Sequence, residues 1–215
     1  DTPEFLPTPA LANAAEHVLG AWTPRAFMLE GLSAVRTGDR ATGPAYTIRL
    51  RKAATRSRQN AARALAAYDA APAGSIVVVQ VMDDLAGAVV GDIIAHRLRK
   101  LGIAGVVVEG PVRDIDGLDA FGPPIWYRDA VATGLEMAET EAEAEVELDI
   151  GGVKVSPGVT VTVDRDGAFF LPRGQAEAIL ARAAAVVARE ETLHAALADG
   201  RSLVDALGFA DAAAS

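Results

Sequence analysis

The residues best suited to chemistry follow an apolar run, in the segment from Glu109 to Asp114. Arg113 and Asp114 place opposite charges side by side, a few residues after Val-Val-Val, where a buried strand is expected to end. In α/β proteins, ligands bind beyond the carboxyl ends of such strands. Arg113 can bind a carboxylate through two parallel hydrogen bonds, and Asp114 can hold a hard divalent cation or its waters. A local ion pair that fixes the loop explains these residues equally well, so both interpretations stay open.

A second segment of interest is Gly91-Asp92-Ile93-Ile94, near the start of an expected helix. The carboxylate of Asp92 can join Asp114 in holding a divalent cation or its waters. The backbone N–H groups of Ile93 and Ile94 can add an anion site where the helix begins. Taken alone, an aspartate at such a position is more typical of a helix cap than of a ligand.

The composition restricts the available chemistry to oxygen ligands. The 215 residues include no cysteine and three histidines, and 29 acids against 20 Lys and Arg give a net charge of −9. Disulfides, thiolate catalysis and thiolate metal sites are therefore excluded. The acidic balance disfavours nucleic acid, no apolar run approaches the ~20 residues of a membrane span, and the first residues lack a basic, apolar leader. We expect a cytoplasmic protein with neither nucleic-acid nor membrane partners.

One segment runs against this acidic balance. Six cations and no acid lie between Arg49 and Arg63. They form either an anion site, for a polycarboxylate or less readily RNA, or a solvated strand end and helix face, which is more typical of charge runs. Farther on, five glutamates alternate from Glu139 to Glu147, so in a strand all five share one face. We expect that face to be solvated surface.

The elements that must position these residues form a recognisable unit. Ser75–Val81 and Ile103–Glu109 are short, β-branched, apolar runs, typical of strands buried on both faces. A helix is expected between them, from Ala86 to Leu101. The order strand, helix, strand predicts a right-handed parallel βαβ unit.

The remaining elements surround this unit. We predict a helix over Thr8–Gly20 with Thr8 as its N-cap, and a long alanine-rich helix over 174–198. After Gly134, alternating patterns separated by Gly and Pro turns predict antiparallel hairpins. No linker rich in Gly, Ser or Pro divides the chain, so we predict one α/β domain over residues 1–215, with mixed sheets, the parallel βαβ unit and outer helices.

At these residues the sequence resembles a known family. Asp92 followed after twenty residues by Arg113-Asp114 matches the D-x20-R-D signature of class II pyruvate aldolases that act on 4-hydroxy-4-methyl-2-oxoglutarate, within the family named for the regulator of ribonuclease activity A (RraA). The likeness runs from about Thr8 to Leu207. Further segments agree in order with that family: Gly43-Pro-Ala-Tyr-Thr47, Pro72-Ala-Gly-Ser-Ile-Val-Val78, Gly151-Gly-Val-Lys-Val-Ser-Pro-Gly158 and Asp164-Arg-Asp-Gly-Ala-Phe-Phe-Leu-Pro172.

The resemblance implies a β/β/α swivelling-type fold that assembles as a homotrimer or as a hexamer, with active sites between subunits. The helix over 174–198 would contact a neighbouring subunit. In the family, a glutamate from the neighbour's C-terminal helix completes the site, and Glu190 or Glu191 aligns with it here.

The resemblance also implies roles within one subunit. Asp114 would bind Mg²⁺ or Mn²⁺, and Arg113 would bind the carboxylate of a 2-oxo acid, helped by the amides of the Gly91–Ile94 segment, chiefly those of Ile93 and Ile94. Asp92 would position a water that acts as acid and base. The implied activity is metal-dependent cleavage of 4-hydroxy-2-oxo acids to pyruvate and a carbonyl product, accompanied by decarboxylation of oxaloacetate.

Two departures and one alternative accompany this resemblance. Asn13 stands where the family's first helix usually has an acid, and Val159 replaces an aspartate after Pro-Gly, which leaves the physiological substrate open. The alternative function is a non-catalytic regulator that binds a ribonuclease. The regulators tend to lack an acid at the position of Asp92, so its presence favours the enzyme.

Overall fold

The computed structural model describes residues 5–20, 26–82 and 85–209. The helices within these residues are α1 (Thr8–Leu19), α2 (Arg58–Asp69), α3 (Asp92–Lys100), α4 (Ile115–Phe121), the 3-10 helix η2 (Met137–Glu139), α5 (Ala176–Ala198) and α6 (Leu203–Ala206). The strands are β1 (Met28–Glu30), β2 (Ser33–Ala34), β3 (Ala41–Lys52), β4 (Ile76–Val81), β5 (Gly105–Val112), β6 (Ile125–Ala130), β7 (Thr140–Ala144), β8 (Leu148–Ile150), β9 (Val153–Val155), β10 (Thr160–Val163) and β11 (Gly167–Phe170).

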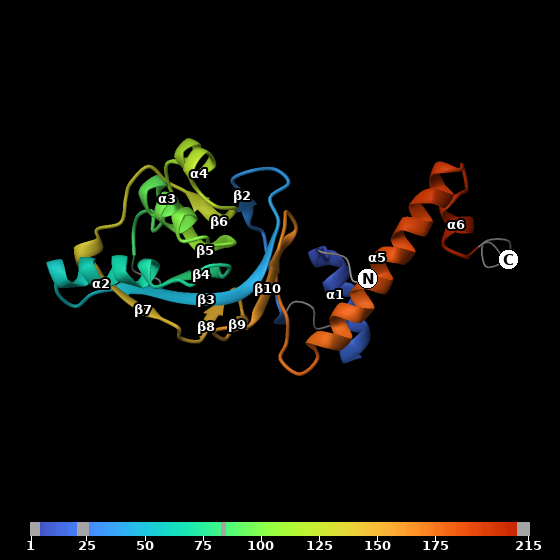
Figure 1. Cartoon of the computed structure of the whole chain (residues 1–215), viewed down its shortest axis with the longest axis horizontal. Coiled ribbons are helices and arrows are strands. Elements are labelled where there is room, and N and C mark those ends of the chain that lie inside the picture. Colours follow the sequence, from blue (N-terminus) through green and yellow to red (C-terminus); the bar gives the residue numbers. More distant parts are fainter. Residues whose placement is uncertain (1–4, 21–25, 83–84, 210–215) are drawn as a thin grey trace.

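One long strand, β3, joins the two halves of a mixed sheet (Figure 1). Within the described residues the strand order is β1-β11-β10-β3-β4-β5-β6-β2, and β7 pairs with β3 outside this path. β3 pairs with β10 in antiparallel fashion through Ala41–Pro44 and with β4 in parallel through Ala45–Leu50. β5 and β6 continue the parallel order. The carboxyl ends of β4, β5 and β6 therefore meet at one edge of the sheet.

The central strands are buried on both faces, as their apolar runs predict. Val77 and Val79 of β4 face a core shared with α2, α3 and α4, whereas Ile76 and Val78 face the hairpin of β8 and β9. All four side chains are fully buried. The two layers lie on opposite sides of the sheet (Figure 1). The predicted α/β fold with a parallel βαβ unit, here β4-α3-β5, and outer helices is confirmed.

The helix of this unit is shorter than predicted. α3 begins at Asp92 rather than at Ala86, and Gly91 precedes it in an extended conformation. Residues 86–91, for which the side-chain pattern predicts helix, instead pair through their backbone with the end of β5 and with the segment after β6. Periodicity could not detect this, because the competing hydrogen bonds come from residues distant in the sequence.

The predicted N-cap of the first helix is also wrong. Thr8 is the first residue of α1 rather than its cap, and it is fully buried. Its backbone N–H and its hydroxyl both donate to the Asp164 carboxylate, over 2.8 and 2.6 Å. Asp164 follows β10, so a side chain 156 residues away caps this helix.

The predicted five-glutamate face is not formed. β7 ends at Ala144, and Glu145 takes a positive φ of 55° that breaks the alternation. Within β7, Glu141 and Glu143 lie beside the basic strand β3, where they form ion pairs with Arg51 at 3.0 Å and Arg49 at 3.4 Å. The basic segment and the acidic segment therefore partly neutralise each other on the surface, which favours the solvated-surface interpretation over an anion site.

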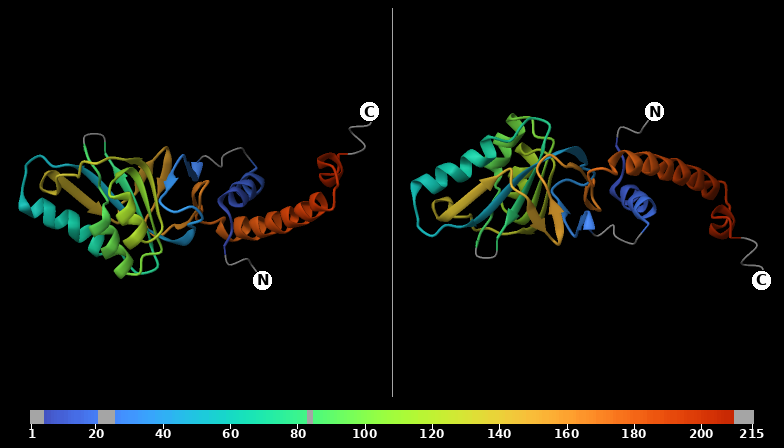
Figure 2. Two further views of the ribbon diagram at one scale, coloured as in Figure 1. Left: turned by 90° about the horizontal axis from the view of Figure 1, so that it is seen from above. Right: turned by 90° about the horizontal axis from the view of Figure 1, so that it is seen from below.

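The last long helix leaves the body of the molecule. α5, predicted over 174–198, packs its first half on α1 and β11 in a third apolar cluster that includes Leu11, Phe169 and Ile179. Its second half extends outward, and α6 lies at its far end (Figures 1 and 2). Among the described residues, none of the helices combines the length and the apolar character needed to span a bilayer.

Candidate active site

Three chain segments are joined at the carboxyl edge of the parallel strands. The loop 85–91, which follows β4, exchanges backbone hydrogen bonds with the end of β5: Val89 N–H donates to Pro111 at 2.9 Å, and Arg113 N–H donates to Val90 at 3.1 Å. The same loop pairs with the segment after β6, because Leu135 N–H donates to Ala88 at 3.0 Å. These contacts fix the backbone on either side of the sequence-predicted site residues.

Gly91, Arg113 and Asp114 lie in direct contact. Arg113 Nε is 3.3 Å from Asp114 Oδ2, with side chains 44% and 43% exposed. A Cβ atom on Gly91 would lie 2.8 Å from Asp114 Oδ2 and 3.2 Å from Arg113 Nε, so a side chain here would displace the Asp114 carboxylate from its present place. The predicted ion pair is therefore present. At this exposure such a pair adds about 0–1 kcal/mol to stability, which leaves both charged groups available to a ligand.

The backbone of Asp114 is in the left-handed region, with φ 59° and ψ 47°. Aspartate is one of the few side chains that tolerate this conformation. The turn reverses the chain so that α4 starts at once, and Leu118 N–H donates to the Asp114 carbonyl at 2.8 Å. Strained conformations of this kind are concentrated at functional sites, and here the turn directs the carboxylate toward Gly91.

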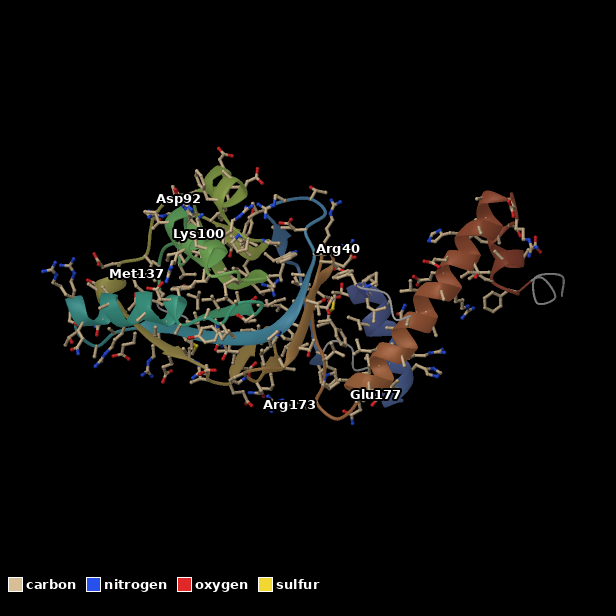
Figure 3. The ribbon with its side chains drawn as sticks, viewed as in Figure 1. Arg40, Asp92, Lys100, Met137, Arg173 and Glu177 are labelled. Carbon is tan, nitrogen blue, oxygen red and sulfur yellow. The ribbon has the colours of Figure 1, made fainter. Side chains whose placement is uncertain are left out.

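Asp92 lies in the first turn of α3, on the side of the sheet that also carries α4 (Figure 3). Its Oδ1 accepts the N–H of Ile93 at 2.8 Å. The Ile93 N–H, predicted to bind an anion, is therefore already engaged by the Asp92 carboxylate. The Ile93 side chain is 80% exposed. Asp92 thus satisfies a helix N–H, as a capping aspartate does, and it directly follows Gly91, beside which the Asp114 carboxylate lies.

Two glycines of this site are missed by sequence reasoning. A Cβ on Gly117, within α4, would lie 2.6 Å from Asp92 Cβ, and one on Gly134 would lie 2.6 Å from Arg113 Nη1. Each glycine leaves room for one of the charged side chains. A glycine inside a helix is unfavourable, so Gly117 carried a signal of a close approach. Gly134 carried none, because it follows β6 in an ordinary loop.

The structure does not bring Glu190 or Glu191 to this cluster. Both are exposed on the outer half of α5, which extends away from the layer that holds α3 and α4 (Figures 1 and 3). Glu190 instead lines a cavity of about 660 Å³ between α1, α5 and α6. Within one chain, these two glutamates and Asp92 are separate.

The donor set fits a largely hydrated magnesium-type ion. Among the described residues, no group of three or more His, Cys, Asp or Glu is suited to holding a metal. Asp92 and Asp114 supply hard carboxylate oxygens, and Mg²⁺ commonly binds through one or two carboxylates and keeps several waters. The remaining ligands would come from water, substrate or another subunit.

A buried tyrosine anchors the loop that leads into the site. Tyr68 of α2 is 2% exposed, and its hydroxyl donates to the Val89 carbonyl at 3.1 Å. Burial raises the pKa of Tyr68 above its usual value of 10.0. The hydroxyl therefore stays protonated and remains a donor to the 85–91 loop, a role that the helical pattern around Tyr68 did not reveal.

Replacing Tyr68 by phenylalanine is expected to lower the free energy of unfolding by about 1–2 kcal/mol, because the buried Val89 carbonyl loses its donor. The raised pKa adds stability that is present below pH 10 and is lost as the pH rises above it, since only the unfolded tyrosine then ionises. The difference between wild type and variant should therefore narrow above pH 10. Urea denaturation at pH 8 and pH 10.5 measures this difference in the free energy of unfolding, with Tyr127→Phe in β6 as the control. Equal stabilities of wild type and Tyr68→Phe at pH 8 would contradict a stabilising hydrogen bond from Tyr68 to Val89.

Comparison with known proteins decides the family. A model of the RraA-like family, described as Aldolase/RraA, matches residues 11–169. The chain belongs to the RraA-like family. The resemblance drawn from the D-x20-R-D signature is thereby confirmed, and the matched residues include Asp92, Arg113 and Asp114.

Relatives of this RraA-like chain carry two kinds of description. A Halalkalibacterium halodurans protein named "Putative 4-hydroxy-4-methyl-2-oxoglutarate aldolase" is 32% identical over 161 residues, covering 75% of this chain and 73% of that protein. A solved structure from Pseudomonas syringae pv. tomato aligns with a TM-score of 0.81 at 26% identity, covering 94% of this chain and 89% of the other. Streptomyces coelicolor RraAS2, described as an unusual member of the RNase ES inhibitor RraA protein family, aligns with a TM-score of 0.69 at 29% identity, covering 85% and 88%.

Proposed function

We propose that this RraA-like protein is a divalent-metal-dependent lyase that cleaves 4-hydroxy-2-oxo acids, of the 4-hydroxy-4-methyl-2-oxoglutarate type, to pyruvate and a carbonyl product. The observation that carries the proposal is the contact of Arg113 and Asp114 around Gly91, at the carboxyl edge of the parallel strands. The aldolase name of the Halalkalibacterium halodurans relative supports the same substrate class.

In this proposal each side chain has a separate task. Arg113 binds the carboxylate of the 2-oxo acid, because its planar fork matches a carboxylate. Asp114 would hold Mg²⁺ or Mn²⁺ through carboxylate oxygen and water. When bound, such a cation supplies Lewis-acid stabilisation of the enolate that forms as the bond breaks.

The proton balance gives Asp92 its role. In the aldol cleavage, the 4-hydroxyl loses its proton, the C3–C4 bond breaks, and its electron pair passes to C3 of the pyruvate enolate, which then takes up a proton. Asp92 holds the water that accepts and returns this proton. Loss of CO₂ from oxaloacetate leaves the same enolate, so we expect decarboxylase activity as well.

The acid that completes the site is proposed to come from a second subunit. Glu190 or Glu191 is exposed on a helix that extends from the body, so a neighbouring molecule in a homotrimer or hexamer can receive it. The ribonuclease-inhibitor description of RraAS2 keeps a regulatory role as the alternative. The charged cluster around Gly91 favours the enzyme, because binding a protein surface does not require these groups to converge.

Purified protein is expected to release pyruvate from 4-hydroxy-4-methyl-2-oxoglutarate or from oxaloacetate in the presence of Mg²⁺. EDTA should abolish turnover, and added Mg²⁺ should restore it. Pyruvate is measured against a protein-free blank that contains Mg²⁺, because the ion alone decarboxylates oxaloacetate slowly. Folded, Mg²⁺-loaded protein that turns over neither compound would refute this substrate class.

A further inference from the structure

The segment that follows β6 presents a glycine to the substrate-binding arginine. Gly134 lies in a backbone bridge with Ala88, and Leu135 N–H donates to the Ala88 carbonyl at 3.0 Å. A Cβ atom on Gly87 would lie 2.7 Å from the Gly134 carbonyl oxygen, so the two backbones are in close contact. Gly134 is therefore held in place by the same loop that leads into α3.

The guanidinium of Arg113 lies across the Cα of this glycine. A Cβ atom on Gly134 would lie 2.6 Å from Nη1, 2.9 Å from Cζ and 3.3 Å from Nη2. These three atoms span the planar end of the side chain, so the end of the fork packs on bare backbone. At the other end of the guanidinium, Arg113 Nε contacts Asp114 Oδ2 at 3.3 Å and would lie 3.2 Å from a Cβ atom on Gly91.

The conformation of Gly134 does not explain the choice of glycine. Its φ is outside the left-handed region, where glycine is otherwise preferred. An alanine is therefore compatible with the backbone here, and the obstacle is the Arg113 guanidinium. Because that group ends a flexible side chain, it would be displaced while the fold remains intact.

We propose that Gly134 is a positioning residue for carboxylate recognition, which fixes the plane of the Arg113 fork by giving it a surface without a side chain. The inference rests on the proposed function in one respect, the role of Arg113 in binding a carboxylate. A fork fixed between Gly134, Gly91 and Asp114 meets a carboxylate without losing conformational freedom on binding. Displacement of a substrate-positioning group by about 1 Å can cost a hundredfold in rate.

The test compares Gly134→Ala with wild type and with Ala132→Ser, an exposed neighbour in the same loop. With Mg²⁺ present, calorimetry measures the Kd for oxalate, a planar mimic of the pyruvate enolate. We expect Gly134→Ala to weaken oxalate binding by about tenfold or more, as for loss of a charge-assisted hydrogen bond, with Ala132→Ser unchanged. KM for the 2-oxo acid should rise by a similar factor with a smaller change in kcat, and the thermal midpoint and Mg²⁺ affinity should stay as in wild type.

A double-mutant cycle separates positioning from a general loss of structure. In an Arg113→Ala background, Gly134→Ala should have no further effect on oxalate affinity, because the group it displaces is absent. An equal loss in both backgrounds, or an unchanged Kd in the single variant, would overturn the proposal, as would a crystal structure of Gly134→Ala with the guanidinium in its original place.

If wild type binds oxalate but turns over no 2-oxo acid, the proposed function fails while the oxalate cycle still decides the role of Gly134. If wild type does not bind oxalate, carboxylate recognition at this site is refuted.

Discussion

Replacing Asp114 by asparagine is expected to lower metal-dependent turnover by at least about a hundredfold, because the substitution removes the carboxylate proposed to hold the cation. Asparagine is the sharper choice than alanine here. The backbone at this position has a φ of 59°, and asparagine tolerates the left-handed region whereas alanine adds strain. Loss of activity in the asparagine variant can then be assigned to the missing charge. Turnover is measured as pyruvate release with Mg²⁺ titrated over its full binding range.

The matched control for this variant is Asp116→Asn. Asp116 is an exposed acid in the first turn of α4, two residues along the chain. Its replacement removes the same charge at nearly the same place, and turnover should be almost unchanged. Calorimetric titration with Mn²⁺ should show weaker binding only in Asp114→Asn, and the stability of both variants should stay within about 0.5 kcal/mol of wild type. Full metal-dependent activity in Asp114→Asn would refute the site assignment.

Replacing Arg113 by alanine is expected to raise KM for the 2-oxo acid by roughly 10- to 100-fold, with a smaller loss in kcat. The estimate follows from the loss of a charge-assisted hydrogen-bonding pair, worth about 1.5–3 kcal/mol. Arg113→Lys should recover only part of the affinity, because an ammonium keeps the charge and lacks the planar fork. Steady-state kinetics over a wide substrate range separate the two parameters.

The same variant should leave cation binding intact or slightly tighter, since Arg113 Nε lies 3.3 Å from Asp114 Oδ2 and repels a cation there. Cation binding therefore distinguishes Arg113→Ala from Asp114→Asn, in which it weakens. Arg97→Ala is the matched control, because Arg97 is an exposed arginine that pairs with Asp69 at 2.6 Å on α2. A KM in Arg113→Ala equal to that of wild type would contradict carboxylate binding by this residue.

Local patterns were sufficient to predict the central strands and their burial. The apolar runs of β4 and β5 identified them as strands covered on both faces, because only a strand between two layers tolerates apolar side chains in both directions. The Gly151-Gly152 hairpin followed from the two positive φ angles that such a turn requires. In these cases the physical cause lies within a few residues of the element itself.

Patterns failed where distant residues supplied the hydrogen bonds. A helix start at Ala86 is too early, because Ala88 pairs with Gly134, after β6, and Val90 pairs with Val112, the last residue of β5. The cap of α1 was assigned to Thr8, whereas Asp164 provides it. Neither partner can be found from the helix sequence alone.

For the site, the sequence by itself determined which groups are present: a pair of charges after a buried strand, an aspartate twenty residues earlier, and oxygen as the only abundant ligand in a chain without cysteine. It also determined the family, through the spacing of Asp92 and Arg113-Asp114. Only the tertiary structure decided that Gly117 and Gly134 lie against Asp92 and Arg113, and that Tyr68 holds the loop before α3. The physical reason is that a close approach between backbone and side chain depends on how separate strands and helices pack. A glycine inside a helix can indicate that something lies close, but neither a glycine nor a tyrosine identifies its distant neighbour.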